Sequence, residues 1–134
     1  MLGLIVIDHG SRRAEANAQL LDVVARLALL APGTVIEPAH MELAEPSLDQ
    51  AFARAVARGA REIRVLPYFL GDGRHAQEDI PRLARAAAAA HAGVVVSVAA
   101  PLGPHDLLAR LLAIRAGLPV AEDDRTGPPV TPGR

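Results

Sequence analysis

The stretch that decides the fold is residues 4–11, which read Leu-Ile-Val-Ile-Asp-His-Gly-Ser. Its first four residues are apolar and mostly β-branched, which predicts a short strand buried on both faces of a parallel sheet. Residues 8–11 form a polar turn. Over residues 12–31 the apolar side chains recur at helical spacing, with Ser11 as the expected N-cap and Pro32 and Gly33 as the stop. The chain therefore opens with one strand–helix unit.

The same pattern repeats three more times along the sequence. A strand is predicted over residues 34–41, and Pro38 within it favours an edge strand or a bulge. Ser47 and Gln50 have the spacing of a capping box, which predicts a helix that ends at Gly59. Further strands are expected over 62–67, with an extension toward 70, and over 94–99. The third helix is expected to begin near Asp79, and the fourth to end near residue 117.

Four successive strand–helix units predict an α/β fold: a four-stranded parallel sheet with helices on both faces, in a flavodoxin-like arrangement. We expect this domain to span residues 1–118. Residues 119–134 contain four Pro and two Gly and almost no apolar pattern, which predicts a disordered tail. In such sheets ligands bind beyond the carboxyl ends of the strands.

The composition excludes several classes of protein. The 134 residues are 51% hydrophobic, which excludes a disordered chain, and the formal net charge of -1 gives no reason to expect nucleic acid as a partner. The chain has no Cys, so thiolate chemistry is excluded, and all 14 basic residues are Arg, so mechanisms that require Lys are excluded. No apolar run spans a membrane and the N-terminus lacks the basic start of a signal peptide, so we expect a cytoplasmic protein.

Polar side chains gather at the predicted strand ends. His9 follows the first strand, Glu42 the second and His75 the third. Each has an ordinary structural interpretation when taken alone, but together they predict a shared site at one edge of the sheet. Two imidazoles and a carboxylate suit Fe, Co, Ni or Zn, and three protein ligands leave positions open for water or substrate.

The other histidines are more ambiguous. His40 lies two residues before Glu42, and its position is compatible with a fourth ligand or a hydrogen-bond partner for Glu42. The favoured interpretation is a polar residue in the pocket wall. His105 lies just after the fourth strand, and its role stays open. His91 is expected to be a solvent-facing residue at a helix end.

The ordered motifs resemble those of the CbiX/SirB family of sirohydrochlorin chelatases over roughly residues 1–115. They are residues 8–12 (Asp-His-Gly-Ser-Arg), 42–48 (Glu-Leu-Ala-Glu-Pro-Ser-Leu), 67–81 and 101–105 (Pro-Leu-Gly-Pro-His). The chain departs from the family pattern at Asp8, where Gly is usual, and at His40, where an apolar residue such as Phe is usual.

The resemblance implies ATP-independent insertion of Co²⁺ or Fe²⁺ into sirohydrochlorin, for cobalamin or siroheme, with Ni²⁺ left open. It implies that His9, Glu42 and His75 hold the ion and carry the chemistry. Single-unit members of the family work as homodimers, so we expect two copies to enclose the macrocycle. No nucleotide is expected, since Lys and a phosphate-binding loop are absent.

Sirohydrochlorin carries many carboxylates, and several residues are candidates to bind it. Gly10 permits close approach of a flat ligand, and the helix that begins after Ser11 directs amides toward an anion. The guanidinium groups of Arg12 and Arg74 fit carboxylates, whereas Arg13 is at least as well explained as a surface charge.

Two alternatives remain open at this point. A non-enzymatic metal-delivery protein would use the same His and Glu ligands, but would bind metal without sirohydrochlorin. Phosphoryl transfer through a histidine is disfavoured, because Asp8 places negative charge where a phosphate needs positive charge.

Overall fold

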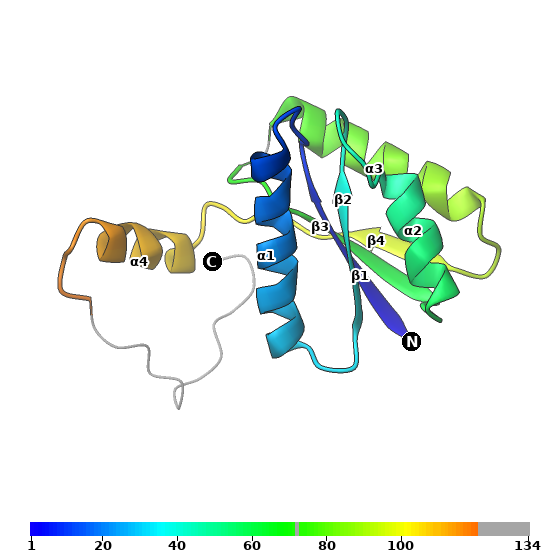
Figure 1. The fold of residues 1–134 in the computed structure, drawn as a ribbon, viewed down its shortest axis with the longest axis horizontal. Coiled ribbons are helices and arrows are strands. Elements are labelled where there is room, and N and C mark those ends of the chain that lie inside the picture. Colours follow the sequence, from blue (N-terminus) through cyan, green and yellow to red (C-terminus); the bar gives the residue numbers. More distant parts are fainter. Residues whose placement is uncertain (72, 121–134) are drawn as a thin grey trace.

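The computed structural model describes residues 1–71 and 73–120, apart from the side chains of residues 74–77. In this part of the chain, strands and helices alternate as predicted (Figure 1): β1 (Leu2–Asp8), α1 (Ala14–Leu30), β2 (Val35–His40), α2 (Leu48–Ala57), β3 (Glu62–Pro67), α3 (Arg74–Ala89), β4 (Val95–Val98) and α4 (Asp106–Arg115). Residues 121–134 of the predicted tail lie outside the described residues.

The sheet is parallel, with the strand order β2-β1-β3-β4, which confirms the predicted arrangement. β1 lies inside the sheet, as expected from its apolar residues, and β2 lies at an edge, as Pro38 predicts. The Ile36 carbonyl accepts from the Arg58 guanidinium and the His40 amide donates to the Pro46 carbonyl, so both point away from β1. Pro38 lies between them with the same orientation, where a missing N–H disrupts no strand pairing.

Helices cover both faces of the sheet, as predicted. α1 packs on one face through Leu20, which lies against Val6 and Ile36. α2 and α3 cover the other face, where Phe52 and Ile80 are fully buried in the larger core. Burial of such side chains contributes about 1.5–3 kcal/mol each, so these two layers hold the strand ends in place.

The start of α2 confirms the capping box. The Ser47 hydroxyl accepts from the Gln50 amide at 3.2 Å, and the Gln50 side chain accepts from the Ser47 amide at 2.8 Å. Gly59 follows the helix with a φ of +105°, a conformation that glycine adopts without strain.

Two predicted helix starts are wrong. α1 begins at Ala14 with Arg13 as its N-cap residue, so Ser11 lies outside the helix and does not cap it. α3 begins at Arg74, five residues before Asp79, and Pro81 lies inside the helix. Pro81 therefore removes one backbone hydrogen bond in the helix interior, and its neighbour Ile80 is fully buried in the core. β3 also ends at Pro67 without the expected extension.

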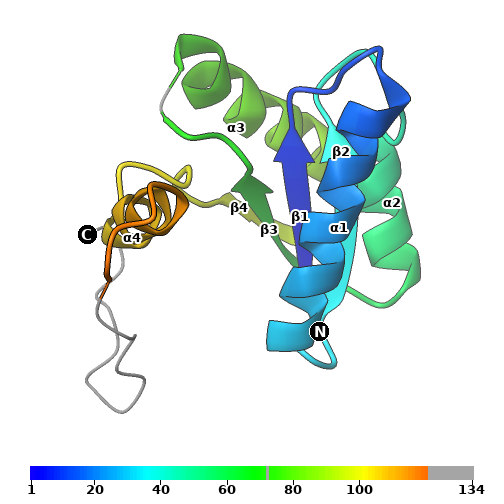
Figure 2. The same cartoon turned by 60° about the vertical axis from the view of Figure 1, so that its left-hand side comes forward.

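α4 differs from the other helices because it does not pack on the sheet. Among the described elements it makes no extensive contact with another helix or strand, and none of its residues is buried. It stands apart from the rest of the domain in both views (Figures 1 and 2). Its apolar residues are exposed instead: Leu107, Leu111, Leu112 and Ile114.

The loops that follow β1 and β2 touch closely at Gly10. A Cβ atom at this position would lie 1.9 Å from the Glu42 carbonyl oxygen, and the φ of +87° is in the left-handed region. Only glycine fits both conditions. The approach of the two loops therefore depends on the missing side chain.

Gly10→Ala tests this approach against Gly33→Ala as the matched control. Gly33 has a φ of +79° and nothing within 4 Å of its Cβ position, so its substitution adds conformational strain alone, about 1–2 kcal/mol. Gly10→Ala adds the overlap with Glu42, about 1–3 kcal/mol more. Urea unfolding measures both losses, and equal losses would contradict the close contact.

Candidate functional site

The backbones of β1 and β2 stay joined beyond the last residues of the strands. The Met41 amide donates to the Asp8 carbonyl at 2.9 Å, and the Glu42 amide donates to the His9 carbonyl at 3.1 Å. These two bonds hold the segments that follow β1 and β2 side by side at the carboxyl edge of the sheet. The structure therefore brings together the backbones of His9 and Glu42, two of the predicted ligands, and both residues are exposed.

The His9 ring stacks on a side chain from the segment after β3. Its centroid lies 4.4 Å from that of Phe69, with 30° between the planes, and Phe69 is 8% exposed. An open cavity of about 290 Å³ adjoins the pair, and Gly10, Asn17 and Tyr68 are among its lining residues. The His9 imidazole is therefore held against the Phe69 ring at the border of an open cavity.

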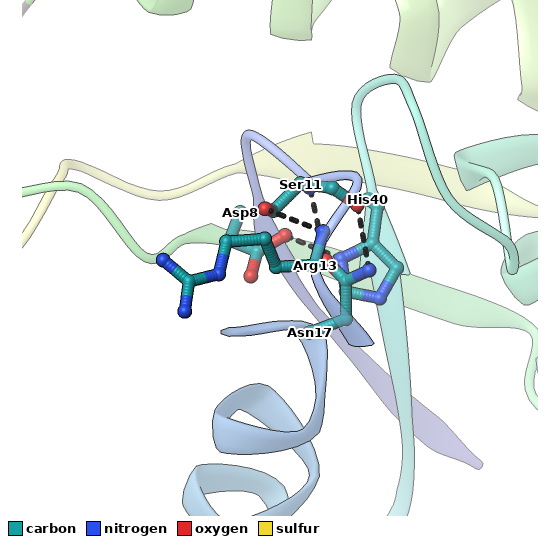
Figure 3. Close-up of polar contacts among 5 residues, drawn as sticks. All are labelled: Asp8, Ser11, Arg13, Asn17 and His40. Atoms are coloured by element: carbon teal, nitrogen blue, oxygen red, sulfur yellow. Dashed lines mark hydrogen bonds and ion pairs between the residues drawn. The ribbon is translucent and has the colours of Figure 1, made fainter. Parts of the chain in front are cut away.

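Asn17 fixes the loop between β1 and α1 (Figure 3). Its side-chain oxygen accepts from the Ser11 amide at 2.9 Å, and its side-chain nitrogen donates to the Ser11 carbonyl at 2.7 Å. The Ser11 hydroxyl accepts from the Arg13 amide at 3.0 Å. The amides of residues 11 and 13 are therefore already paired within the protein, and Asn17 gives the loop one fixed shape.

Sequence reasoning missed the roles of Phe69 and Asn17. Phe69 is one of only two Phe in the chain and follows a strand, which is a usable signal for a site in a chain this poor in aromatic residues. Asn17 falls inside a helical pattern, and Asn in that position often bonds to nearby backbone.

His75 and Arg74 lie in the first turn of α3, which starts after β3. The carboxyl ends of parallel strands lie at one edge of the sheet, and the start of α3 lies at the same edge as the ends of β1 and β2 (Figure 2). The side chains of both residues lie outside the described part of the structure. Among the side chains that are described, no three His, Asp or Glu gather as a metal site, and His75 stays a prediction.

The remaining histidines have structural contacts. The Nδ1 atom of His40 lies 2.5 Å from the Asp8 carboxylate, not against Glu42, and the residue is 3% exposed. The Nδ1 atom of His105 accepts from the Leu107 amide at 3.0 Å and caps α4. His91 lies at the end of α3 as expected, but it is half-buried and stacks on Phe52, so it does not simply face the solvent.

Both arginines of the loop are exposed. The Arg13 guanidinium lies 3.2 Å from the Glu15 carboxylate, in agreement with a surface charge. A backbone hydrogen bond, followed by the contact with Arg13, lowers the pKa of Glu15. Arg12 extends from the same loop and stays the better candidate to meet an anionic ligand.

Several known proteins are similar to this chain in sequence. The sequence model of the CbiX family matches residues 3–117. The chloroplastic sirohydrochlorin ferrochelatase of Arabidopsis thaliana is 47% identical over 106 residues, which cover 79% of this chain and 47% of that protein. The sirohydrochlorin cobaltochelatase of Methanococcoides burtonii is 32% identical over 123 residues, which cover 86% of this chain and 94% of that protein.

Two solved structures share the fold. A cobalamin biosynthesis CbiX protein from Marinobacter aquaeolei has a TM-score of 0.71 and 34% identity, over 87% of this chain and 93% of that one. SirB from Bacillus subtilis with Fe³⁺ has a TM-score of 0.76 and 27% identity, over 88% of this chain and 48% of that one. The chain therefore spans about half the length of the Arabidopsis and Bacillus proteins. On the match of the family model and these identities, the chain belongs to the CbiX family.

Proposed function

We propose that this chain is an enzyme that inserts a divalent metal ion, Co²⁺ or Fe²⁺, into sirohydrochlorin without ATP. The observation that carries the proposal is the joining of His9 and Glu42 at the carboxyl edge of the sheet, beside an open cavity. The names of the Arabidopsis and Methanococcoides relatives support the same reaction and the same substrate.

The reaction exchanges the ligands of the ion. The metal leaves its protein ligands and bonds to the ring nitrogens, while two pyrrole N–H groups release their protons. In our proposal His9 and His75 bind the ion and Glu42 completes the ligand set or relays protons. Once the ion has left its protein ligands, one of the freed imidazoles accepts one proton, since imidazole changes charge near neutral pH, and the second proton passes to Glu42 or to water.

The macrocycle is proposed to lie in the open cavity beside His9. Phe69 and Tyr68 supply aromatic surface for a flat ring, and the absence of a side chain at Gly10 allows a close approach. Carboxylates on the rim of sirohydrochlorin pair in this proposal with Arg12 and Arg74. Because the Ser11 amide is bonded to Asn17, Ser11 would meet the substrate through its hydroxyl group.

The choice of metal stays open between iron and cobalt, and the ligand set does not exclude nickel. Affinity among divalent ions follows intrinsic chemistry, so supply in the cell decides much of the selection. Among the similar proteins, the Arabidopsis relative is named for iron and the Methanococcoides relative for cobalt, while SirB of Bacillus subtilis has been solved with Fe³⁺ and with cobalt.

Single substitutions test the reaction. We expect His9→Ala and His75→Ala each to lower the rate of metal insertion to the non-enzymatic background, because the ion loses an imidazole ligand. The assay is anaerobic absorption spectroscopy of sirohydrochlorin with Co²⁺ and Fe²⁺. His91→Ala, at the far end of α3, is the control and keeps the rate. Full activity of either ligand variant would contradict the site.

The alternative is a metal-delivery protein with the same ligands. A measurement of sirohydrochlorin binding in the absence of metal distinguishes the two functions. A chelatase binds the macrocycle and accelerates insertion above background, whereas a delivery protein binds the ion alone.

We also propose that the chain works as a homodimer. α4 and the loops before it leave Leu70, Leu111 and Leu112 at least 43% exposed around an open apolar cavity of about 520 Å³. Such a continuous apolar surface is typical of a contact with another protein. A second copy suits it, because this chain has about half the length of the SirB chain, so that two copies together match one.

Leu112→Glu tests the dimer. A carboxylate in the apolar contact is expected to convert the dimer to a monomer, because burial of an unpaired charge is costly. Leu29→Glu is the matched control, since Leu29 is 84% exposed on α1 and lies outside this surface. Analytical ultracentrifugation measures both masses. A monomeric unaltered chain, or a dimeric Leu112→Glu variant, would contradict the proposed interface.

None of the helices within residues 1–71 and 73–120 has both the length and the apolar character of a transmembrane segment. The cytoplasmic location stays a prediction, and the chloroplast is the location named for the Arabidopsis relative.

A further inference from the structure

One partly buried polar contact is not used by the proposed reaction. Asp8 and His40 are the last residues of β1 and β2 and face each other in the register of the two strands. The His40 Nδ1 atom lies 2.5 Å from a carboxylate oxygen of Asp8 (Figure 3). The side chain of His40 is 4% exposed and that of Asp8 is 20% exposed. Because an ionised carboxylate only accepts, the Nδ1–H group of His40 is the donor.

Stability alone does not explain this pair. His40 is buried and Asp8 is partly buried, so the pair loses much of its contact with water, and apolar residues of similar volume are often as stable or more stable in such places. The strand residues on the same face, Val6 and Ile36, lie in an apolar cluster under α1. An apolar side chain at position 40 would match these neighbours. Unlike an apolar contact, the hydrogen bond between Asp8 and His40 has a preferred distance and angle, and it therefore fixes the position of each side chain relative to the other.

The pair is close in sequence to two of the proposed ligands, one on each strand. The residue after Asp8 is His9, and Glu42 follows His40 by two positions. β2 is an edge strand, so no strand on its outer side holds its end. The end of β2 is tied to β1 by the backbone bonds of Met41 and Glu42 and by the contact between Asp8 and His40.

We propose that Asp8 and His40 are a positioning pair that sets the separation between His9 and Glu42. Neither side chain touches the ion in this proposal. The pair acts through the backbone. It holds the last residues of β1 and β2 in place, so that the His9 imidazole and the Glu42 carboxylate reach one ion. The inference rests on the proposed function, because it assigns a role relative to that metal site.

The test is binding of Co²⁺ to the full chain without tetrapyrrole, followed by the visible absorption of the bound ion. The band positions report the geometry of the ligands, which loss of stability alone does not move. We expect His40→Leu to weaken binding about ten-fold and to shift the bands. His40→Asn keeps a donor for Asp8 and is expected to stay within about two-fold of the unaltered chain.

A double variant tests whether the two residues act as a unit. The losses from Asp8→Leu and His40→Leu are expected not to add, so that the double variant binds no more weakly than His40→Leu alone. Thermal unfolding checks that each variant is folded, and His40→Phe, which fills the volume of the ring, replaces His40→Leu if that variant does not fold.

Unchanged affinity and band positions in folded His40→Leu or His40→Phe would overturn the inference, and so would additive losses. His9→Ala tests the proposed function separately. If His9→Ala binds Co²⁺ as the unaltered chain does, the proposed metal site is wrong. If His9→Ala loses the ion while His40→Leu keeps it with the same bands, the positioning role alone is wrong.

Discussion

The site depends on the pairing of β1 with β2 and on its continuation past the ends of both strands. The amides of Met41 and Glu42 bond to the carbonyls of Asp8 and His9, and the Glu42 carbonyl lies where a side chain at position 10 would be. Parallel pairing sets the register of β1 and β2. The backbone amides and carbonyls just beyond the two strands keep the same register where the sheet ends. The distance between two residues more than thirty positions apart is thus controlled by a few backbone contacts.

Much of this arrangement follows from the sequence because its local signals agree with the fold. The apolar first strand, the capping box at Ser47 and Pro38 at the sheet edge each express one local preference that packing then reinforces. The start of α1 could not be found in this way, since Asn17 bonds to the backbone of Ser11 from six residues away. The start of α3 does not follow from Pro81, because proline prefers the first turn of a helix and here lies in the interior, next to the fully buried Ile80. Asp8 and His40, two departures from the family pattern, are partners in the structure, which no single position in the sequence indicates.

Our proposals assign separate roles to two surfaces of the domain. The carboxyl edge of the sheet carries His9, Glu42 and the first turn of α3, and offers open space beside an aromatic wall. α4 carries an apolar surface that no described part of this chain covers. In our account the first surface holds the ion and the macrocycle, and the second joins two copies, which together match the length of the SirB chain.

Convergence of three side chains on one ion is the central claim, and anomalous diffraction at the cobalt edge tests it most directly. Crystals of the protein grown with Co²⁺ are predicted to give one strong peak per chain at the carboxyl edge of the sheet, in contact with His9, Glu42 and His75. A peak bound by other residues, with these three side chains turned away from the ion, would contradict the account.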